Sequence, residues 1–214
     1  MPLILKTAIL SFFSYILGSI PFALIISKRI KGMDIRKFGS GNVGATNVAR
    51  ALGRKWGVLV FILDFLKGFL PVMFSFYFLP EAFDFKIISI FIGICSVSGH
   101  NWPVFLKFKG GKGVSVSIGV VTALSVSLSF MRIPVIAAFS VWVIVFLIFK
   151  IVGIASLAFA LILFSVCLFL HGVPLEYKLF SLLIALFIFV RHKKNIRDIL
   201  DRLQRTGRQT AKNR

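Results

Sequence analysis

Seven apolar stretches occupy most of this chain, and short polar segments separate them. The stretches cover residues 3–27, 57–79, 87–99, 114–131, 133–149, 151–170 and 179–190. A helix needs about 20 apolar residues to cross the hydrocarbon core of a bilayer. The pattern therefore predicts an all-α, polytopic membrane protein with seven transmembrane helices. Because the third stretch is short and the fourth contains five serines, we expect these two helices to pack inside the bundle.

The composition is incompatible with a soluble globular domain. Hydrophobic residues make up 58% of the 214 residues and only seven residues are acidic, whereas a soluble domain carries roughly 25% charged residues of both signs. Once the apolar stretches are set aside, little of the chain is left for a domain outside the membrane. We therefore expect one membrane domain over residues 1–196, followed by a basic, frayed cytoplasmic tail over residues 197–214.

Lysine and arginine residues are distributed unevenly between the polar segments. If the N-terminus lies outside, the inner segments carry 21 of these residues and the outer segments carry 3. Because cytoplasmic loops are enriched in Lys and Arg, this predicts an N-out/C-in orientation. The same bias explains the net charge of +19, so nucleic acid binding is not expected. The first stretch is long enough to span and precedes a basic cluster, so we expect it to remain rather than to be cleaved as a signal.

Three polar clusters fall on the predicted cytoplasmic side, at residues 38–50, 99–113 and 191–197. The first two are rich in glycine, whose backbone freedom lets amide N–H groups converge on an anion, and the lysines of the second add positive charge. From Ala45 onward the residues favour a helix whose N-terminus would point at the same anion, and Arg50 offers a two-pronged contact to phosphate. His192 and Asn195 are three residues apart and share one helix face. The clusters together predict one phosphate-binding constellation.

Each cluster also has a simpler interpretation. The glycine-rich segments can be interfacial loops whose lysines and Arg50 contact lipid headgroups. A nucleotide-binding P-loop is excluded, because Leu106 stands where its first glycine is required and Gly113 stands where Ser or Thr should follow the lysine. Cys95 and Cys167 lie in apolar stretches and acidic residues are scarce in the clusters, so neither a disulfide nor a metal site is expected.

Two ionisable residues, Asp64 and Lys67, lie inside the second apolar stretch. Ionisable residues within a membrane span are paired or functional. Because these two are three residues apart and opposite in charge, we predict a structural ion pair that buttresses the site.

Four motifs give the chain a resemblance to a known family. They are Gly-Ser-Gly-Asn-Val-Gly-Ala-Thr-Asn-Val-Ala-Arg at 39–50, Asp-x-x-Lys-Gly at 64–68, Gly-His-Asn-Trp-Pro-Val-Phe-Leu-Lys-Phe-Lys-Gly-Gly-Lys-Gly-Val at 99–114, and Arg-His-x-x-Asn-Ile at 191–196. In sequence and order they resemble the motifs of the PlsY family of bacterial glycerol-3-phosphate acyltransferases. The resemblance extends over nearly the whole chain.

The resemblance implies a seven-span enzyme of the bacterial inner membrane whose active site faces the cytoplasm. Such an enzyme transfers a fatty acyl group from acyl phosphate to the 1-hydroxyl of sn-glycerol 3-phosphate, giving lysophosphatidic acid and phosphate for phospholipid biosynthesis. Its partners are these substrates and membrane phospholipids, with no cofactor, metal or obligate protein partner implied. As catalytic residues the family motifs imply Ser40, Arg50, His192 and Asn195. As substrate- and phosphate-binding residues they imply Asn42, Asn47, Lys107, Lys109, Gly110, Gly111, Lys112, Gly113 and Ser156.

The chain departs from the family pattern at a few positions. The family pattern around Ser156 is Lys-Tyr-Val-Ser-Leu-x-Ser, whereas this chain has Lys-Ile-Val-Gly-Ile-Ala-Ser. After Asn-Ile-x the third family motif continues with Arg and Leu, whereas this chain has Asp198 and Ile199, and Gln204 stands at the position of a family glutamate. Any structural salt bridge made by that glutamate must be absent or replaced here.

The chemistry of the implied reaction agrees with the residues that are present. Acyl phosphate is a mixed anhydride with a good leaving group, so direct attack by the glycerol hydroxyl needs no acyl-enzyme. A His-x-x-x-x-Asp acyltransferase motif is missing, since Phe105 follows His100 at that spacing. Either His192 or a substrate phosphate oxygen can accept the hydroxyl proton.

Two other classes of function remain as alternatives. One is a transporter or flippase for a phosphorylated metabolite or lipid, and the other is a non-catalytic lipid-binding protein. The chain shows no internal repeat and its polar clusters fall on one side, which disfavours a transporter.

Overall fold

The computed structural model describes the backbone of residues 2–79 and 85–212 and the side chains of residues 2–79 and 86–197. Within these backbone ranges the chain is helical and has no strand, which confirms the all-α prediction. The α-helices are α1 (Leu3–Ser19), α2 (Phe22–Lys31), α3 (Ala45–Leu52), α4 (Arg54–Phe78), α5 (Phe85–Asn101), α6 (Val114–Ser127), α7 (Arg132–Phe149), α8 (Val152–Phe169) and α9 (Leu175–Lys212). The short 3-10 helices are η1 (Ile35–Lys37), η2 (Val104–Leu106) and η3 (Ser129–Met131).

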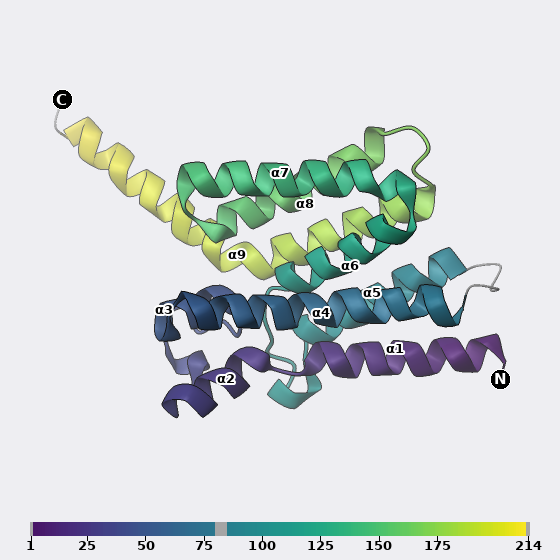
Figure 1. Cartoon of the computed structure of the whole chain (residues 1–214). Helices are drawn as coiled ribbons and strands as arrows, with labels where there is room; N and C mark the ends of the chain where they lie inside the picture. Colours follow the sequence, from purple (N-terminus) through teal and green to yellow (C-terminus); the bar gives the residue numbers. More distant parts are fainter. Residues whose placement is uncertain (1, 80–84, 213–214) are drawn as a thin grey trace.

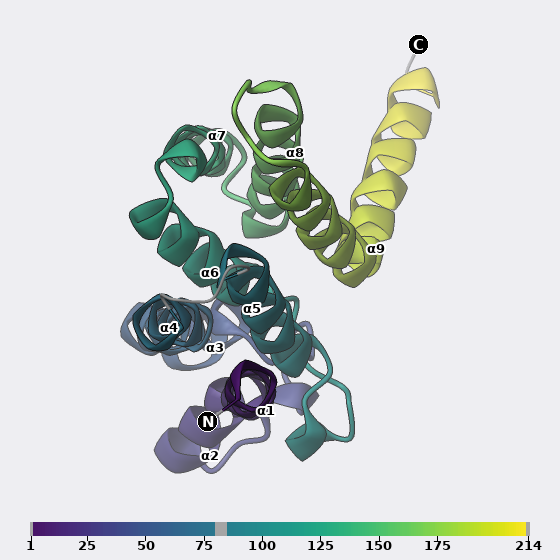
Figure 2. The same ribbon diagram turned by 90° about the vertical axis from the view of Figure 1, so that its right-hand side faces the viewer.

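The long helices form an antiparallel bundle of two groups that meet at α6 (Figures 1 and 2). Helices α1, α4 and α5 pack together on one side, α7, α8 and α9 pack together on the other, and α6 lies against α4. Helices α2 and α3 gather at the end of the bundle from which α9 projects (Figure 1).

Several of these helices have the length and composition of membrane spans. Among the described residues, five stretches are long and apolar enough to cross a bilayer, namely Leu3–Lys31, Arg54–Phe78, Lys86–Leu106, Ser129–Phe149 and Val152–Phe169, and α6 is apolar but shorter. The apolar window of Lys86–Leu106 is 56% buried, compared with 11% for Ser129–Phe149, and residues 116–121 of α6 are all buried. The third and fourth predicted helices therefore pack inside the bundle, as expected.

The first apolar stretch is interrupted. The sequence predicts one helix across residues 3–27, but α1 ends at Ser19 and α2 begins at Phe22. Pro21 has no N–H to donate, and its ring disfavours the helical conformation of the residue before it. Ile20 is accordingly extended, with a ψ of 118°. The prediction of a continuous first helix is wrong for this local reason, and the break lies beside the site described below.

The end of the chain also differs from expectation. The sequence predicts a frayed tail after residue 196, but the backbone of α9 continues as a helix to Lys212 and projects away from the bundle (Figure 1). Between residues 191 and 212 the chain has no proline and one glycine, so no strong helix-stop signal interrupts it.

Helices α4 and α6 approach closely at two glycines. A Cβ added at Gly68 would lie 2.2 Å from the carbonyl oxygen of Val116, and a Cβ added at Gly119 would lie 2.1 Å from that of Phe65. Small residues allow helix backbones in membranes to come into such contact. This contact fixes α6 in the middle of the bundle.

Replacing Gly68 by valine should therefore destabilise the protein, because the added atoms overlap the α6 backbone. Overpacking of this kind costs about 1–3 kcal/mol, which should lower the melting temperature in detergent by a few degrees, as followed by tryptophan fluorescence. Ser140→Val enlarges an exposed side chain of α7 and should leave the melting temperature nearly unchanged. Equal melting temperatures for Gly68→Val and wild type would contradict the close α4–α6 contact.

Candidate active site

Residues of all three polar clusters surround one cavity of about 610 Å³. The cavity lies where the loop before α3, the loop before α6 and residues 191–195 of α9 meet. It is lined by Arg36, Gly39, Ser40, Gly41, Asn42, Val43, Phe108, Lys109, Gly110, Lys112, Arg191, Lys194 and Asn195. Segments more than 150 residues apart in the sequence thus share one space, in agreement with the predicted single constellation.

The lining of this cavity is strongly cationic. Five of its side chains are basic, from Arg36, Lys109, Lys112, Arg191 and Lys194, and none of the described lining residues is acidic. Closely spaced cations around a concave surface attract anions and concentrate them. The cavity is therefore suited to ligands that carry phosphate.

A hydrogen bond joins the second cluster to the third across the cavity. The Lys112 ammonium donates to Oδ1 of Asn195 at 2.7 Å. On its other side Asn195 packs against the first turn of α8, where a Cβ added at Gly153 would lie 2.6 Å from its Nδ2 atom. The Asn195 side chain is therefore held between the loop before α6 and the first turn of α8.

Arg191 fixes the glycine loop to α9. Its Nε donates to the Gly111 carbonyl at 2.9 Å and its Nη2 donates to the Gly110 carbonyl at 2.6 Å. The guanidinium carbon lies 6.0 Å from the centre of the Trp102 ring, which in turn packs edge-on against Phe187. The planar guanidinium thus binds two successive peptide groups, a geometry that a lysine does not reproduce.

The glycines of the second cluster serve a different purpose from the predicted one. The N–H groups of Gly110 and Gly111 do not converge on an anion, because they donate to the carbonyls of Asn101 at 3.3 Å and His100 at 3.1 Å. A Cβ at either glycine would lie 2.1 Å from an atom of His100. Gly113 has a φ of +76° and begins α6 as its N-cap. These positions need glycine because the loop packs directly against the end of α5.

Asn47 organises the loop of the first cluster. Its Oδ1 accepts from the Ser40 N–H at 3.2 Å, and its Nδ2 donates to the carbonyls of Ile35, Phe38 and Asn42 at 3.2, 2.9 and 3.2 Å. The side chain is 1% exposed and lies outside the cavity lining. Its described contacts hold Ser40 and Asn42 at the cavity edge.

Three predicted site residues lie elsewhere in the structure. Arg50 is exposed in the last turn of α3, and Lys107 is exposed at the end of η2. Ser156 is buried in α8, where its hydroxyl donates to the Val152 carbonyl at 2.8 Å. The structure does not bring these three side chains to the cavity lining.

His192 is buried behind the lining, at 2% exposure. Its Nδ1 lies 2.8 Å from the Ile188 carbonyl, and a carbonyl can only accept, so Nδ1 carries the proton and Nε2 is left as an acceptor. Burial, and then the nearby positive charge of Lys112, lower the pKa of His192 from 6.5 to about 4. The imidazole is therefore neutral at physiological pH.

This shift has a consequence for stability. Below about pH 6.5 the unfolded chain takes up a proton at His192 that the folded protein does not, so stability falls between about pH 6.5 and pH 4. The melting temperature should drop between pH 7 and pH 5, and it should drop less in His192→Gln. An equal drop in both proteins would show that His192 does not keep a lowered pKa.

Sequence reasoning missed three of the cationic lining residues, Arg36, Arg191 and Lys194. Arg191, Lys194 and Asn195 share one helix face at the spacing i, i+3, i+4, a signal that finds all three together. Arg36 follows no motif, but its Nη2 pairs with Asp34 at 2.6 Å and its hydrogen bond holds the pKa of that carboxyl well below its usual range.

The part of the chain that the structure describes contains no cluster of metal-binding side chains. No three His, Cys, Asp or Glu residues lie close enough together there to hold a metal ion.

Known proteins resemble this chain over most of its length. The sequence model of a family described as glycerol-3-phosphate acyltransferase matches residues 8–202. The glycerol-3-phosphate acyltransferase of Aquifex aeolicus is 43% identical over 206 residues, which cover 96% of this chain and 98% of the relative. That of Wolbachia pipientis is 41% identical over 193 residues, which cover 90% and 94%.

Two solved structures have the same fold. They are crystal structures of PlsY, an integral membrane glycerol 3-phosphate acyltransferase, in a glycerol 3-phosphate form and in a lysophosphatidic acid form. Their TM-scores are 0.81 and 0.79, and both are 42% identical and cover 92% of each chain. The family match covers most of the chain, and the motif clusters that carried the sequence resemblance meet at one cavity. This multi-pass membrane protein therefore belongs to the PlsY family of glycerol-3-phosphate acyltransferases.

Proposed function

We propose that this protein transfers a fatty acyl group from acyl phosphate to the 1-hydroxyl of sn-glycerol 3-phosphate, giving lysophosphatidic acid and inorganic phosphate. The observation that carries the proposal is the cavity where all three motif clusters meet, whose described lining contains five basic side chains and no acidic one. Both substrates bear phosphate, so a cavity with this cationic lining binds each of them and stabilises the phosphate that leaves.

The reaction in this cavity is a direct displacement. The hydroxyl oxygen of glycerol 3-phosphate attacks the acyl carbon, the bond from that carbon to the phosphate oxygen breaks, and the hydroxyl proton passes to a base. Lys112 and Asn195, held together by their 2.7 Å hydrogen bond, lie at the cavity edge where a phosphate or hydroxyl oxygen can be bound. Ser40 and Asn42 supply further polar groups from the opposite loop.

Two groups are candidates for the base. His192 is neutral and its Nε2 is an acceptor, which suits it to orient the hydroxyl or to take its proton. A substrate phosphate oxygen, with a second pKa near 6, is the other candidate. Because the pKa of His192 is about 4, a loss of activity near pH 6 would belong to the substrate phosphate.

The membrane placement belongs to the same proposal. We propose seven spans, formed by α1, α4, α5, α6, α7, α8 and α9, in an N-out/C-in orientation in the inner membrane of a bacterium, with the cavity facing the cytoplasm. Support comes from the distribution of 21 inner against 3 outer Lys and Arg residues. On this placement residues 1–196 form the membrane domain and residues 197–214 form a basic segment beside anionic lipid.

The predicted site residues outside the lining remain part of the proposal. Arg50 and Lys107 are exposed cations, and contact with a substrate phosphate is proposed for both. Ser156 lies on α8 one turn beyond Gly153, which packs on Asn195, and a contact with substrate is proposed for it as well.

The donor requirement tests the proposal directly. Purified protein in detergent, given palmitoyl phosphate and radiolabelled glycerol 3-phosphate, should form labelled lysophosphatidic acid, whereas palmitoyl-CoA should not replace the donor. The cationic lining favours a phosphate leaving group. Efficient turnover of acyl-CoA would contradict the requirement for acyl phosphate. In a parallel assay with palmitoyl phosphate labelled in its acyl group, label retained on the denatured protein would contradict direct transfer.

Arg191 provides a second test. Arg191→Lys should lower kcat/KM for glycerol 3-phosphate about as much as Arg191→Ala, roughly tenfold to hundredfold, because an ammonium does not bind both loop carbonyls. Arg132→Lys is the matched control, since Arg132 donates Nε to the Ser125 carbonyl at 3.3 Å far from the site and should retain wild-type kinetics. Near-normal kinetics in Arg191→Lys would show that a charge alone suffices.

A further inference from the structure

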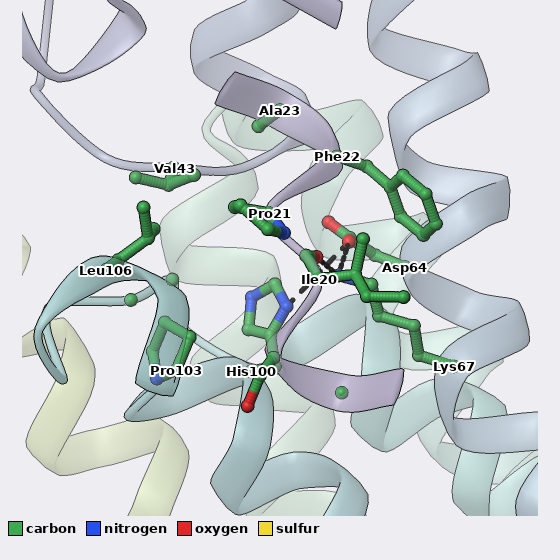
Figure 3. A pocket seen from close by; sticks show the side chains of 14 residues that line it. Ile20, Pro21, Phe22, Ala23, Val43, Asp64, Lys67, His100, Pro103 and Leu106 are labelled. Atoms are coloured by element: carbon green, nitrogen blue, oxygen red, sulfur yellow. Dashed lines mark hydrogen bonds and ion pairs between the residues drawn. The ribbon is translucent and has the colours of Figure 1, made fainter. Parts of the chain in front are cut away.

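A buried charged cluster lies directly behind the cavity. Lys67 and Asp64, both on α4, are 2% and 3% exposed in their side chains, and His100 at the end of α5 is 9% exposed. The cluster borders a small cavity of about 10 Å³ (Figure 3). The proposed reaction uses none of these three residues.

Lys67 completes the break in the first helix. Its ammonium donates to the carbonyl of Ile20, the residue that follows α1, and also to Oδ1 of Asp64 at 2.7 Å. The face of the Phe22 ring lies 4.7 Å from the same nitrogen. Inside an apolar bundle no water is available to the carbonyls of a broken helix. The ion pair therefore supplies the partner that lets the chain turn at this point.

His100 connects the ion pair to the glycine loop. Its Nδ1 lies 3.8 Å from Oδ1 of Asp64, and its ring points toward Asp64 below the Ile20 break (Figure 3). A Cβ added at Gly111 would lie 2.1 Å from its Nε2, and its carbonyl accepts from the Gly111 N–H at 3.1 Å. The residue thus touches the charged cluster on one side and the loop on the other.

The small cavity and the site cavity share a wall. Val43 and Gly110 line both of them. A change in the position of the ion pair or of His100 acts on this wall from behind. Because the wall also borders the site cavity, its position determines how much room a ligand has beside the basic lining residues.

We propose, on the basis of the proposed acyltransferase function, that Asp64, Lys67 and His100 are positioning residues. They hold the helix break in place and, through it, the position of the wall that Val43 and Gly110 form. The position of this wall fixes the width of the site cavity that the substrates enter. This goes beyond a stabilising ion pair, because a buried pair can often be replaced by apolar residues without loss of stability, whereas removal of one partner is costly. A role in stability alone therefore predicts that replacing both partners restores function together with folding.

The test compares single and double replacements. Lys67→Met should lower both the melting temperature and the activity. Asp64→Leu combined with Lys67→Met leaves no unpaired buried charge, so it should recover much of the melting temperature lost in Lys67→Met, although the Ile20 carbonyl still lacks Lys67. It should nevertheless retain a kcat/KM for glycerol 3-phosphate roughly tenfold to hundredfold below wild type. Ser75→Ala, which removes another buried polar side chain of α4, is the control and should match wild type. A double variant with both a normal melting temperature and normal kcat/KM would overturn the proposal.

His100 gives a second route if the double variant does not fold. His100→Ala should raise KM for glycerol 3-phosphate about tenfold with a smaller change in kcat, because the loop wall loses its support, and His100→Gln should recover part of the loss. Wild-type KM in a folded His100→Ala would overturn the positioning role. An inactive wild-type protein would instead overturn the proposed function itself, so the two failures are distinguishable.

Discussion

Backbone groups that leave a helix inside an apolar bundle need partners, and the site of this protein is built where that need is met. The peptide groups of Gly110 and Gly111 are bound from both sides. Their N–H groups donate to the end of α5, and their carbonyls accept from Arg191 of α9. The loop before α6 is therefore held between the two halves of the bundle, and Lys109 and Lys112 extend from it to the cavity lining.

The same principle accounts for the rest of the site. Asn47 binds four backbone groups of the first loop, and Lys67 binds the carbonyl exposed by the Pro21 break. Because these partners satisfy the backbone, the cationic lining of the cavity is left to bind ligand anions. Buried polar groups and Arg191 thus fix the loops, and the lining side chains, Arg191 among them, supply the positive field.

Hydropathy and charge were enough to predict a helical membrane protein, the inward packing of α5 and α6, the start of α3 at Ala45 and the meeting of three distant clusters. These features depend on local preference and on which side of a membrane a loop occupies. The helix break and the use of Arg191 depend on contacts with other helices, which periodicity does not report. The glycines illustrate the difference. Their presence predicted a loop that approaches something closely, but only the fold shows that the partner is His100 rather than an anion.

The central claim is that the three motif clusters form one anion site. A crystal structure of the protein with bound glycerol 3-phosphate tests it most directly. The phosphate should lie in the cavity within hydrogen-bond distance of at least two of Lys109, Lys112, Arg191 and Lys194, with the glycerol hydroxyl near Asn195. A phosphate bound outside this cavity, with the lining side chains unchanged, would contradict the claim.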